Sequence, residues 1–423
     1  MGRASMKRRR FVDVLLPILR PAVALILKCL VNQRVVKAPP KGLKAPYLIL
    51  SSHITDFDVF LLMMHVDSFP VAVVHELLVR NPYLRMALML FGTIIKRSGV
   101  PEAMCIRQMK RAVSSGRSVL IYPQGDVIWA GSNEPLKMEI AKLARYLGVP
   151  VLVMRQDGAY TTYPRWANGV RRGRIDIRYE VAVEKGDFES NDDAALLSRM
   201  SAAFDHDERS WLKGGEGAGV RFISTAPARG LQRLLFLCPG CGTFGHMSGM
   251  GNTISCLSCG SHAIVSPRLS LEGQAQGLGD IWQWHEWQSR VWRDRVSEGF
   301  PEGNFKITEG NLEAKSIAVP KVSSTGGNLG FARRIWKPGV PLPVQTAVLT
   351  PGGFRLEGDD GSAIREVGFD DIEMVYVASF YRPNLLIVKT REEYLRIRFR
   401  RHSNPAYAWS LAIKQMVALS EAK

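Results

Sequence analysis

The fold is decided by the stretch Pro46-Tyr47-Leu48-Ile49-Leu50-Ser51-Ser52-His53-Ile54-Thr55-Asp56-Phe57-Asp58. It begins as an apolar, strand-like run and continues into a polar turn in which four residues separate His53 from Asp58. A neutral imidazole is well suited to accept a proton near pH 7, and an adjacent carboxylate can fix its tautomer. Thr55 and Asp58 also have the spacing of a helix N-cap and its acidic partner. We expect a helix to begin at Thr55, with His53 in the loop before it; the alternative is that Asp58 only caps this helix.

Length and charge limit the choice of protein class. A chain of 423 residues is long enough for two or three domains, and its 46% hydrophobic and 22% charged residues describe an ordered, globular protein. The net charge of +17 indicates an anionic partner or surface. Nucleic acid and an anionic membrane face are the usual candidates.

The N-terminal segment favours the membrane. The basic cluster Lys7-Arg8-Arg9-Arg10 precedes an apolar stretch over 11–31 that charged residues and two prolines interrupt. Its longest uncharged run, Pro21 to Leu27, is far shorter than the roughly 20 residues of a spanning helix. We expect residues 1–40 to form basic interfacial helices on anionic headgroups. The alternative is an amphipathic helix packed on the neighbouring domain. Since nothing indicates an oxidising compartment, we expect a peripheral or monotopic protein at the cytoplasmic face of a membrane.

The region 41–215 alternates between strand-like and helical patterns, which predicts an α/β domain with a largely parallel sheet. The expected strands lie at 48–51, 69–74, 94–96, 118–122, 149–154 and 173–184, and the expected helices at 58–64, 82–90, 101–114 and 136–147. A polar, acidic helical region over 187–213 closes this domain.

The rest of the chain reads as smaller modules. We expect a cysteine module at 232–265, a Trp-rich helix at 275–298, a Gly/Pro/Ser-rich linker at 299–338 and a β-rich domain with a terminal helix at 339–423. The chain contains no internal repeats.

Four short blocks follow one another in the α/β domain. After the His53/Asp58 pair come Gly92-Thr93-Ile94-Ile95-Lys96-Arg97, then Tyr122-Pro123-Gln124-Gly125, then Val149-Pro150-Val151. In this order and spacing, over about residues 40–185, the chain resembles the glycerolipid acyltransferase family, whose best-known members are the 1-acylglycerol-3-phosphate acyltransferases.

The resemblance implies a reaction. His53 would deprotonate the hydroxyl of a lysolipid acceptor, which would attack the thioester carbonyl of an acyl-CoA or acyl-carrier protein. Asp58 would orient the imidazole. The implied substrate-binding residues are Thr55, Arg97, Tyr122, Pro123, Gln124, Gly125 and Lys137. For Arg97 and Lys137 the alternative is a solvated surface charge.

The third block departs from the family pattern. Where the family usually reads Glu-Gly-Thr-Arg, this chain reads Gln124-Gly125-Asp126-Val127. The Glu is replaced by a neutral amide, and Val127 stands where an Arg commonly helps to hold glycerol phosphate. Loss of a cationic fork weakens binding of a phosphate monoester. A lysophospholipid, an aminolipid or another hydroxylated lipid is therefore as credible an acceptor as lysophosphatidic acid.

Four of the six cysteines form two pairs with metal-ligand spacing. Cys238-Pro-Gly-Cys241 and Cys256-Leu-Ser-Cys259 are each followed by a glycine, and fourteen residues separate them. Two such knuckles can close a tetrahedral thiolate site, as in zinc ribbons. Because disulfides are disfavoured in the cytosol, we expect structural Zn²⁺.

Two further features are open to two interpretations each. The helix at 275–298 carries Trp282, Trp284, Trp287 and Trp292, which serve either core packing or a membrane interface. The C-terminal region resembles a PH-like or GRAM-like module. Its arginines Arg396, Arg398 and Arg400 alternate on one strand face, forming either an anionic-lipid patch or a solvated face.

The sequence thus predicts a membrane-associated O-acyltransferase that moves a fatty acyl group onto a lysolipid hydroxyl, with Zn²⁺ as a structural cofactor. The rival interpretation is a zinc-ribbon adaptor that binds lipid or nucleic acid through a non-catalytic acyltransferase-like domain. Of these partners, nucleic acid is the less expected.

Overall fold

The computed structural model describes most of the chain, in segments. These are residues 17, 20–25, 27, 31–55, 58–66, 68–76, 85–86, 88, 91–96, 102–273, 276–302, 307–318, 339–378, 385–400 and 406–421. The chain divides into two compact units. Unit 1 comprises Met1–Pro164, Val170–Ile223 and Val322–Arg334, and unit 2 comprises Arg165–Gly169, Ser224–Lys321 and Ile335–Lys423.

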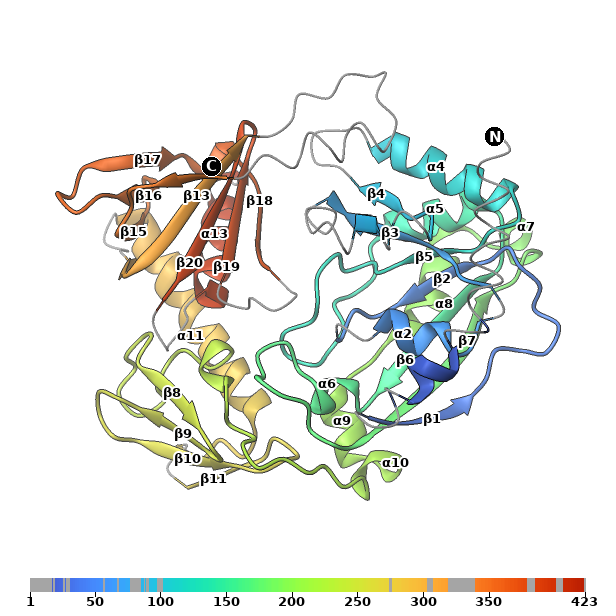
Figure 1. Ribbon diagram of the computed structural model, residues 1–423, viewed down its shortest axis with the longest axis horizontal. Helices are drawn as coiled ribbons and strands as arrows, with labels where there is room; N and C mark the ends of the chain where they lie inside the picture. The colour runs from blue at the N-terminus through green and yellow to red at the C-terminus, as the bar shows by residue number, and fades with distance from the viewer. Residues whose placement is uncertain are drawn as a thin grey trace. The chain divides into compact units, whose positions relative to one another are not determined.

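Unit 1 is built on a seven-stranded sheet with the strand order β1-β7-β6-β2-β5-β3-β4 (Figure 1). The strands are β1 (Asn32–Lys37), β2 (Leu48–Ser51), β3 (Val71–His75), β4 (Ile94–Lys96), β5 (Val119–Ile121), β6 (Val151–Asp157) and β7 (Arg174–Val183). Only the β6–β7 pair is antiparallel. The prediction of an α/β domain with a largely parallel sheet is confirmed.

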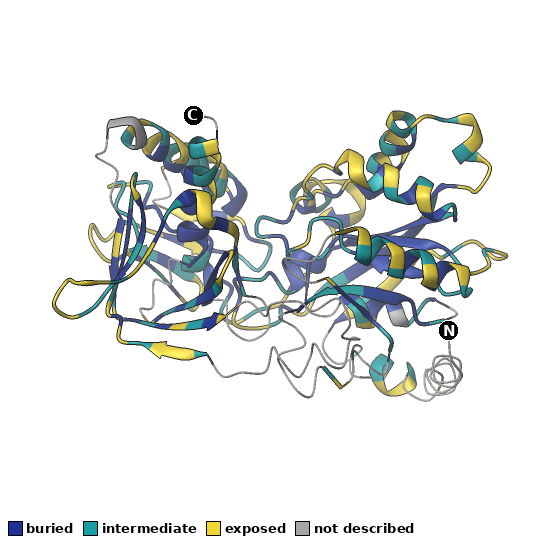
Figure 2. Cartoon of the chain, turned by 90° about the horizontal axis from the view of Figure 1, so that it is seen from above, coloured by how far each residue is buried: buried dark blue, intermediate teal, exposed yellow. Residues whose placement is uncertain are grey.

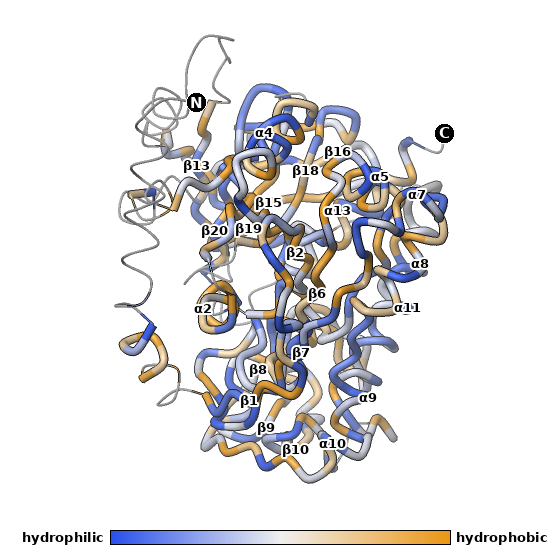
Figure 3. Tube along the Cα trace, turned by 90° about the vertical axis from the view of Figure 1, so that its right-hand side faces the viewer, coloured by the Kyte–Doolittle hydropathy of each residue, from blue (hydrophilic) through white to orange (hydrophobic). Residues whose placement is uncertain are grey.

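Helices cover both faces of this sheet. On one face lie α4 (Glu102–Ser114), α5 (Met138–Leu147) and α8 (Asp193–Phe204), which share a core with alternate residues of the strands. Among these strand residues are Leu48, Leu50, Val119, Ile121, Val151 and Val153. The short helix α2 (Asp58–Met63) lies on the other side of the sheet (Figure 3). Figure 2 shows the strands as buried, with exposed residues on the outer sides of the helices.

The alternation of side chains along the strands also determines which residues face α2. Because successive side chains of a strand point to opposite faces, Ile49, Leu120 and Met154 face away from the α4/α5/α8 core. Tyr179 on β7 is paired directly with Met154 and shares this face. The α2 side of the sheet is therefore a separate buried layer, and it is the layer that carries the candidate active site.

The N-terminal prediction needs a correction. Residues 32–37, expected within the interfacial helices, form β1 at the edge of the sheet, paired in parallel with β7. Residues 20–25 are helical, and most of the segment before residue 31 lies outside the described residues. So does most of the expected helix 82–90. Among the described residues, no helix is both long and apolar enough to cross a membrane.

The acidic region after β7 forms three helices, namely α7 (Asp187–Ser190), α8 and α9 (Glu208–Lys213), and α10 (Gly215–Ala218) follows them. The short α6 (Ala159–Thr162) follows β6. Glu208, fully buried at the start of α9, accepts hydrogen bonds from the backbone N–H groups of Gly158 (2.9 Å) and Thr161 (2.8 Å) and thereby ties α9 to α6.

Unit 2 begins with the cysteine module. Its four-stranded antiparallel sheet has the order β11-β10-β9-β8. The strands are β8 (Met247–Met250), β9 (Thr253–Cys256), β10 (His262–Val265) and β11 (Leu271–Gly273), so the module extends beyond the expected end at 265. A single turn of 3₁₀ helix, Leu231–Arg233, precedes it.

The C-terminal part of unit 2 consists of two sheets and a helix. One sheet has the order β12-β15-β16-β17 and the other β14-β13-β20-β19-β18. The strands are β12 (Ile307–Gly310), β13 (Leu312–Ala318), β14 (Val340–Leu342), β15 (Thr346–Thr350), β16 (Gly353–Glu357), β17 (Ala363–Val367), β18 (Ile372–Val377), β19 (Leu385–Thr390) and β20 (Glu393–Phe399). Helix α13 (Ala406–Glu421) buries Trp409 beside Phe354 and Phe399, at ring-centroid distances of 6.0 Å and 5.8 Å. The expected linker 299–338 is corrected, because β12 and β13 lie within it.

Three of the four tryptophans named on α11 (Ile281–Glu302) pack inside unit 2, as the core-packing interpretation expects, and Trp287 is half-buried. Trp282, Trp284 and Trp292 are buried. The indole N–H of Trp284 donates to the carbonyl of Leu237 at 2.9 Å, and Trp292 stacks on Phe244 at 4.9 Å. The helix thus joins the cysteine module to the rest of the unit.

A buried charge network fixes the end of β6 to α9. Nδ1 of His206 lies 3.0 Å from Asp157, and its Nε2 lies 3.3 Å from Glu208. Arg155 and Arg178 also contact Asp157, at 3.2 Å and 2.7 Å. Burial lowers the pKa of His206, but the hydrogen bonds with the two carboxylates outweigh burial and raise this pKa to about 9. The imidazole is therefore charged at neutral pH.

This network predicts a loss of stability at alkaline pH. Because the pKa of His206 is higher in the folded chain than its usual 6.5, its contribution is complete below pH 6.5 and disappears as the pH rises through 9. We expect about 3 kcal/mol to be lost across this window. Urea unfolding between pH 6 and 10 measures it, with His206→Gln as the comparison. If the variant retains the same pH dependence over this window, His206 is not its source.

Candidate active site and metal site

The His53 and Asp58 side chains meet at the start of α2, as the sequence predicts. Nδ1 of His53 lies 2.9 Å from Oδ2 of Asp58. The Asp58 side chain is fully buried, whereas 24% of the His53 side chain remains exposed. A carboxylate at Nδ1 holds the proton on that nitrogen and leaves Nε2 as the basic atom. The pair therefore has the arrangement of a general base and its orienting carboxylate.

Asp58 is fixed by the loop that precedes it. Its carboxylate accepts hydrogen bonds from the backbone N–H of Ile54 at 2.7 Å and of Thr55 at 3.0 Å. The Thr55 hydroxyl donates to the same carboxylate at 2.8 Å. Thr55, expected among the substrate-binding residues, is buried and orients Asp58 instead. The described helix begins at Asp58, three residues after the expected start at Thr55, and Asp58 lies in its first turn as expected.

The third sequence block, Tyr122 to Gly125, begins beside the His53 side chain. Tyr122 stacks on the His53 ring, with 4.5 Å between centroids and 24° between planes. The turn from Tyr122 to Gly125 is closed by a 3.0 Å hydrogen bond from the Gly125 N–H to the Tyr122 carbonyl. Pro123 and Gln124 occupy its centre, and Gly125 adopts φ +71°, which favours glycine.

Two polar groups of this block lack partners. Among the described residues, neither the hydroxyl of Tyr122 nor either atom of the Gln124 amide makes a hydrogen bond, although all three atoms are buried. Burial, followed by the nearby Asp58 and Tyr179, raises the pKa of Tyr122 well above its usual value, so the hydroxyl stays protonated. The turn thus places the ring of Tyr122, with its protonated hydroxyl, beside His53.

Two cationic residues, Arg97 and Lys137, were expected to bind substrate. Arg97 lies outside the described residues. Lys137 is exposed at the N-cap of α5, a helix that packs on the opposite face of the sheet from α2. Among the described residues no hydrogen bond or ion pair joins it to His53, Asp58 or Tyr122. A substrate-binding role for Lys137 therefore has no support from this geometry.

Two residues near the site escaped the sequence analysis. Tyr179 is fully buried on the α2 face, and its ring meets the edge of His65 at 6.0 Å and 67°. The only signal in the sequence was a tyrosine hydroxyl on the apolar face of the strand over 173–184. His65 follows α2 and has no motif around it.

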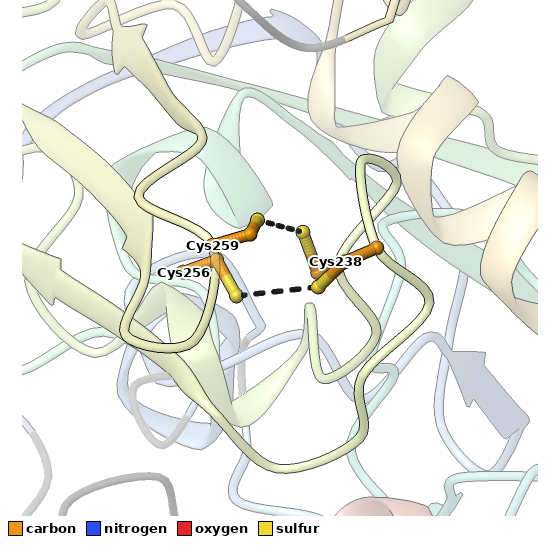
Figure 4. Close-up of side chains that lie close together, drawn as sticks. Cys238, Cys256 and Cys259 are labelled. Carbon is orange, nitrogen blue, oxygen red and sulfur yellow. Dashed lines mark hydrogen bonds between the residues drawn. The ribbon is translucent and has the colours of Figure 1, made fainter.

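The four clustered cysteines come together in unit 2. Their sulfur atoms all lie within 4.8 Å of one another, with Cys238 3.6 Å from Cys259 and Cys241 3.8 Å from Cys256. Figure 4 shows Cys256 and Cys259 of one loop facing Cys238 of the other. Tetrahedral coordination at Zn–S distances of about 2.3 Å separates the sulfurs by about 3.8 Å. The cluster therefore fits a metal ion of the size and preference of zinc.

Backbone geometry explains the glycine after each cysteine pair. Gly242 and Gly260 have φ values of +69° and +76°, a region that other residues adopt only with strain. Their N–H groups donate to the carbonyls of Cys238 at 2.8 Å and Cys256 at 3.0 Å. Each knuckle is thus closed by a glycine that turns the chain back toward its first cysteine.

One comparison with known proteins covers the first site. Residues 30–155 match the family model named Acyltransferase, a range that includes His53, Asp58 and the Tyr122–Gly125 turn. One similar solved structure is the 1-acyl-sn-glycerophosphate (LPA) acyltransferase, PlsC, from Thermotoga maritima. It is 17% identical, with a TM-score of 0.40, over 50% of this chain and 82% of that one. No curated protein sequence matches the chain significantly.

The cysteine cluster predicts a metal-dependent fold of its module. We expect about one Zn²⁺ per purified chain, and we expect Cys256→Ser to lose the ion and lower the melting temperature, because structural zinc contributes folding free energy. Leu257→Ala is the control, since Leu257 lies between two ligands but is 71% exposed. Metal analysis and thermal unfolding with and without chelator measure both effects. Equal melting curves for the wild type in either condition would contradict a structural ion.

Proposed function

We propose that this chain, which contains an acyltransferase-family domain over residues 30–155, is a membrane-associated O-acyltransferase acting on the hydroxyl of a lysolipid. The observation that carries the proposal is the 2.9 Å contact between Nδ1 of His53 and the buried carboxylate of Asp58. It leaves Nε2 as the basic nitrogen of an imidazole whose side chain is 24% exposed.

The residues present support one reaction sequence. Nε2 of His53 takes the proton of the acceptor hydroxyl while the oxygen attacks the thioester carbonyl of the acyl donor, an acyl-CoA or acyl-carrier protein. The new C–O bond forms, the C–S bond breaks, and the imidazolium returns the proton to the leaving thiolate. Asp58 stabilises the imidazolium through Nδ1, as an orienting carboxylate does.

The third block favours an acceptor without a phosphate monoester. Gln124 contributes a neutral amide, and Val127 is a buried apolar side chain rather than a cation. A dianionic phosphate gains most of its binding from charge-assisted hydrogen bonds. A lysophospholipid with a diester headgroup, or another hydroxylated lipid, fits these residues better than lysophosphatidic acid.

Exposed apolar residues in unit 1 support the membrane association. Leu25 is 65% exposed, Phe60 on α2 45% and Met86 62%. Exposed apolar side chains can insert at a membrane interface, and the basic cluster over 7–10 would attract anionic headgroups. We propose that the protein is peripheral or monotopic at the cytoplasmic face of a membrane.

Unit 2 completes the proposal. We assign structural Zn²⁺ to Cys238, Cys241, Cys256 and Cys259, and a PH-like or GRAM-like character to residues 307–421. The arginines of β20 give little support to an anionic-lipid patch. Arg398 and Arg400 both form ion pairs with Glu313 on the neighbouring strand, so their charges are already partly neutralised. The hydrogen bond from Arg400 lowers the pKa of Glu313, so this pairing persists at neutral pH.

Removal of the base tests the reaction. With acyl-CoA and a panel of lysolipids, we expect His53→Ala to reduce turnover by at least about 100-fold, the usual contribution of a general base. His262→Ala is the control, because His262 is exposed in unit 2. Mass spectrometry of the acylated lipid measures transfer. If His53→Ala and the wild type turn over every acceptor equally, catalysis by His53 is wrong.

Vesicle binding tests the membrane proposal. We expect the full chain to sediment with vesicles containing anionic lipid, and replacement of Lys7, Arg8, Arg9 and Arg10 by alanine to weaken binding, by about 1 kcal/mol for each charge at the surface. Neutral phosphatidylcholine vesicles are the control. Salt should weaken vesicle binding by the wild type more than binding by the variant, because salt screens the attraction between the basic cluster and the anionic lipid. Equal sedimentation of the two proteins with anionic vesicles would contradict this role.

A further inference from the structure

The α2 face of the sheet carries polar atoms that the proposed reaction leaves unused. Tyr179 on β7 is paired with Met154 on β6, which is in turn paired with Ser51 on β2. Leu120 on β5 lies on the same face, and Tyr122 follows it by two residues. Tyr122 and Tyr179 thus lie on one face of the sheet, on either side of β6 and of β2, the strand that leads to His53.

Three buried hydrogen-bonding atoms on this face have no partner among the described residues. They are the hydroxyls of Tyr122 and Tyr179 and Nε2 of His65. Tyr179 is 0% exposed, and its ring contacts His65 at 6.0 Å. A buried polar group without a hydrogen bond costs about 1–3 kcal/mol, so several in one layer need a physical reason. They lie in the layer where His53 stacks on Tyr122.

The surrounding charges define what these atoms can bind. Burial, followed by Tyr47, raises the pKa of Tyr179, and burial raises that of Tyr122, so both hydroxyls remain donors. Burial, followed by the nearby Arg20, lowers the pKa of His65, which is neutral at pH 7. Beside them lies the buried charge of Asp58, which disfavours a second anion. An uncharged oxygen, such as a carbonyl, suits this set of neutral groups.

We propose that Tyr179, Tyr122 and His65 form a hydrogen-bonding subsite for the ester carbonyl that a lysolipid acceptor already carries. This inference rests on the proposed function, since it names a part of the acceptor bound beside His53. Tyr179 is a binding residue here and takes no part in proton transfer. The subsite distinguishes an acceptor with an acyl chain from one whose chain is attached through an ether.

The test compares Tyr179→Phe with the wild type on two lipids. The probes are 1-acyl and 1-O-alkyl lysophosphatidylcholine of equal chain length, below their micelle concentrations. We expect the variant to weaken binding of the acyl lipid by about 3- to 10-fold, the worth of one hydrogen bond, and to leave the ether lipid unchanged. Ligand-dependent shifts in melting temperature report binding, so this reading does not require turnover.

Stability separates a binding role from a structural one. Because the Tyr179 hydroxyl has no partner among the described residues, Tyr179→Phe should not lower the melting temperature of the lipid-free protein. Tyr160→Phe is the matched control, since the Tyr160 hydroxyl donates to the Trp129 carbonyl at 2.6 Å. That variant should melt at a lower temperature while keeping the preference for the acyl lipid.

Several outcomes would overturn the subsite. They are a fall in melting temperature for Tyr179→Phe without a change in lipid preference, equal weakening of both lipids, or no binding of either lipid by the wild type. A rise in the KM for acyl-CoA with an unchanged acceptor KM would assign the tyrosines to the donor thioester instead. If the acyl lipid binds as expected and no acceptor is acylated, the subsite stands and the proposed reaction fails.

Discussion

The buried carboxylate of Asp58 is the interaction on which the candidate active site depends. It accepts hydrogen bonds from the backbone of Ile54 and Thr55 and from the Thr55 hydroxyl, and it contacts Nδ1 of His53. A charge removed from water is tolerated only when such donors surround it. The carboxylate therefore dictates the path of the loop before α2, the start of that helix and the nitrogen of His53 that remains basic. A change at any of these donors alters all three.

The parallel sheet brings the other half of the site to this carboxylate. Strands β2 and β5 are neighbours and run in the same direction, so the residues after their carboxyl ends meet at one edge. His53 and Tyr122 stand at these two positions and stack, although 68 residues separate them in the chain. The geometry arises from strand order, and the helices α4, α5 and α8 on the other face hold that order in place.

The first module of unit 2 combines a buried apolar core with a cluster of four cysteines. The sulfurs of two glycine-closed knuckles converge, and α11 supplies buried tryptophans that pack beside them. Small modules commonly need a metal or a neighbouring element to supplement a small core. The second part of the unit has two sheets and a helix that buries Trp409.

The sequence by itself determined the features that depend on local spacing. The His53/Asp58 pair, the turn at Tyr122 and the two cysteine knuckles each involve residues within one short segment, where backbone geometry fixes what can meet. The largely parallel sheet was also predictable, since strand and helix periods alternate along the chain. Only the tertiary structure decided that 32–37 is an edge strand and that Lys137 begins a helix on the far face. It also decided that the hydroxyl of Tyr179 lies in the layer of His53 without a hydrogen-bond partner among the residues that the structure describes. Such features depend on strand order and on which face a side chain meets, and these arise from contacts between segments far apart in the chain.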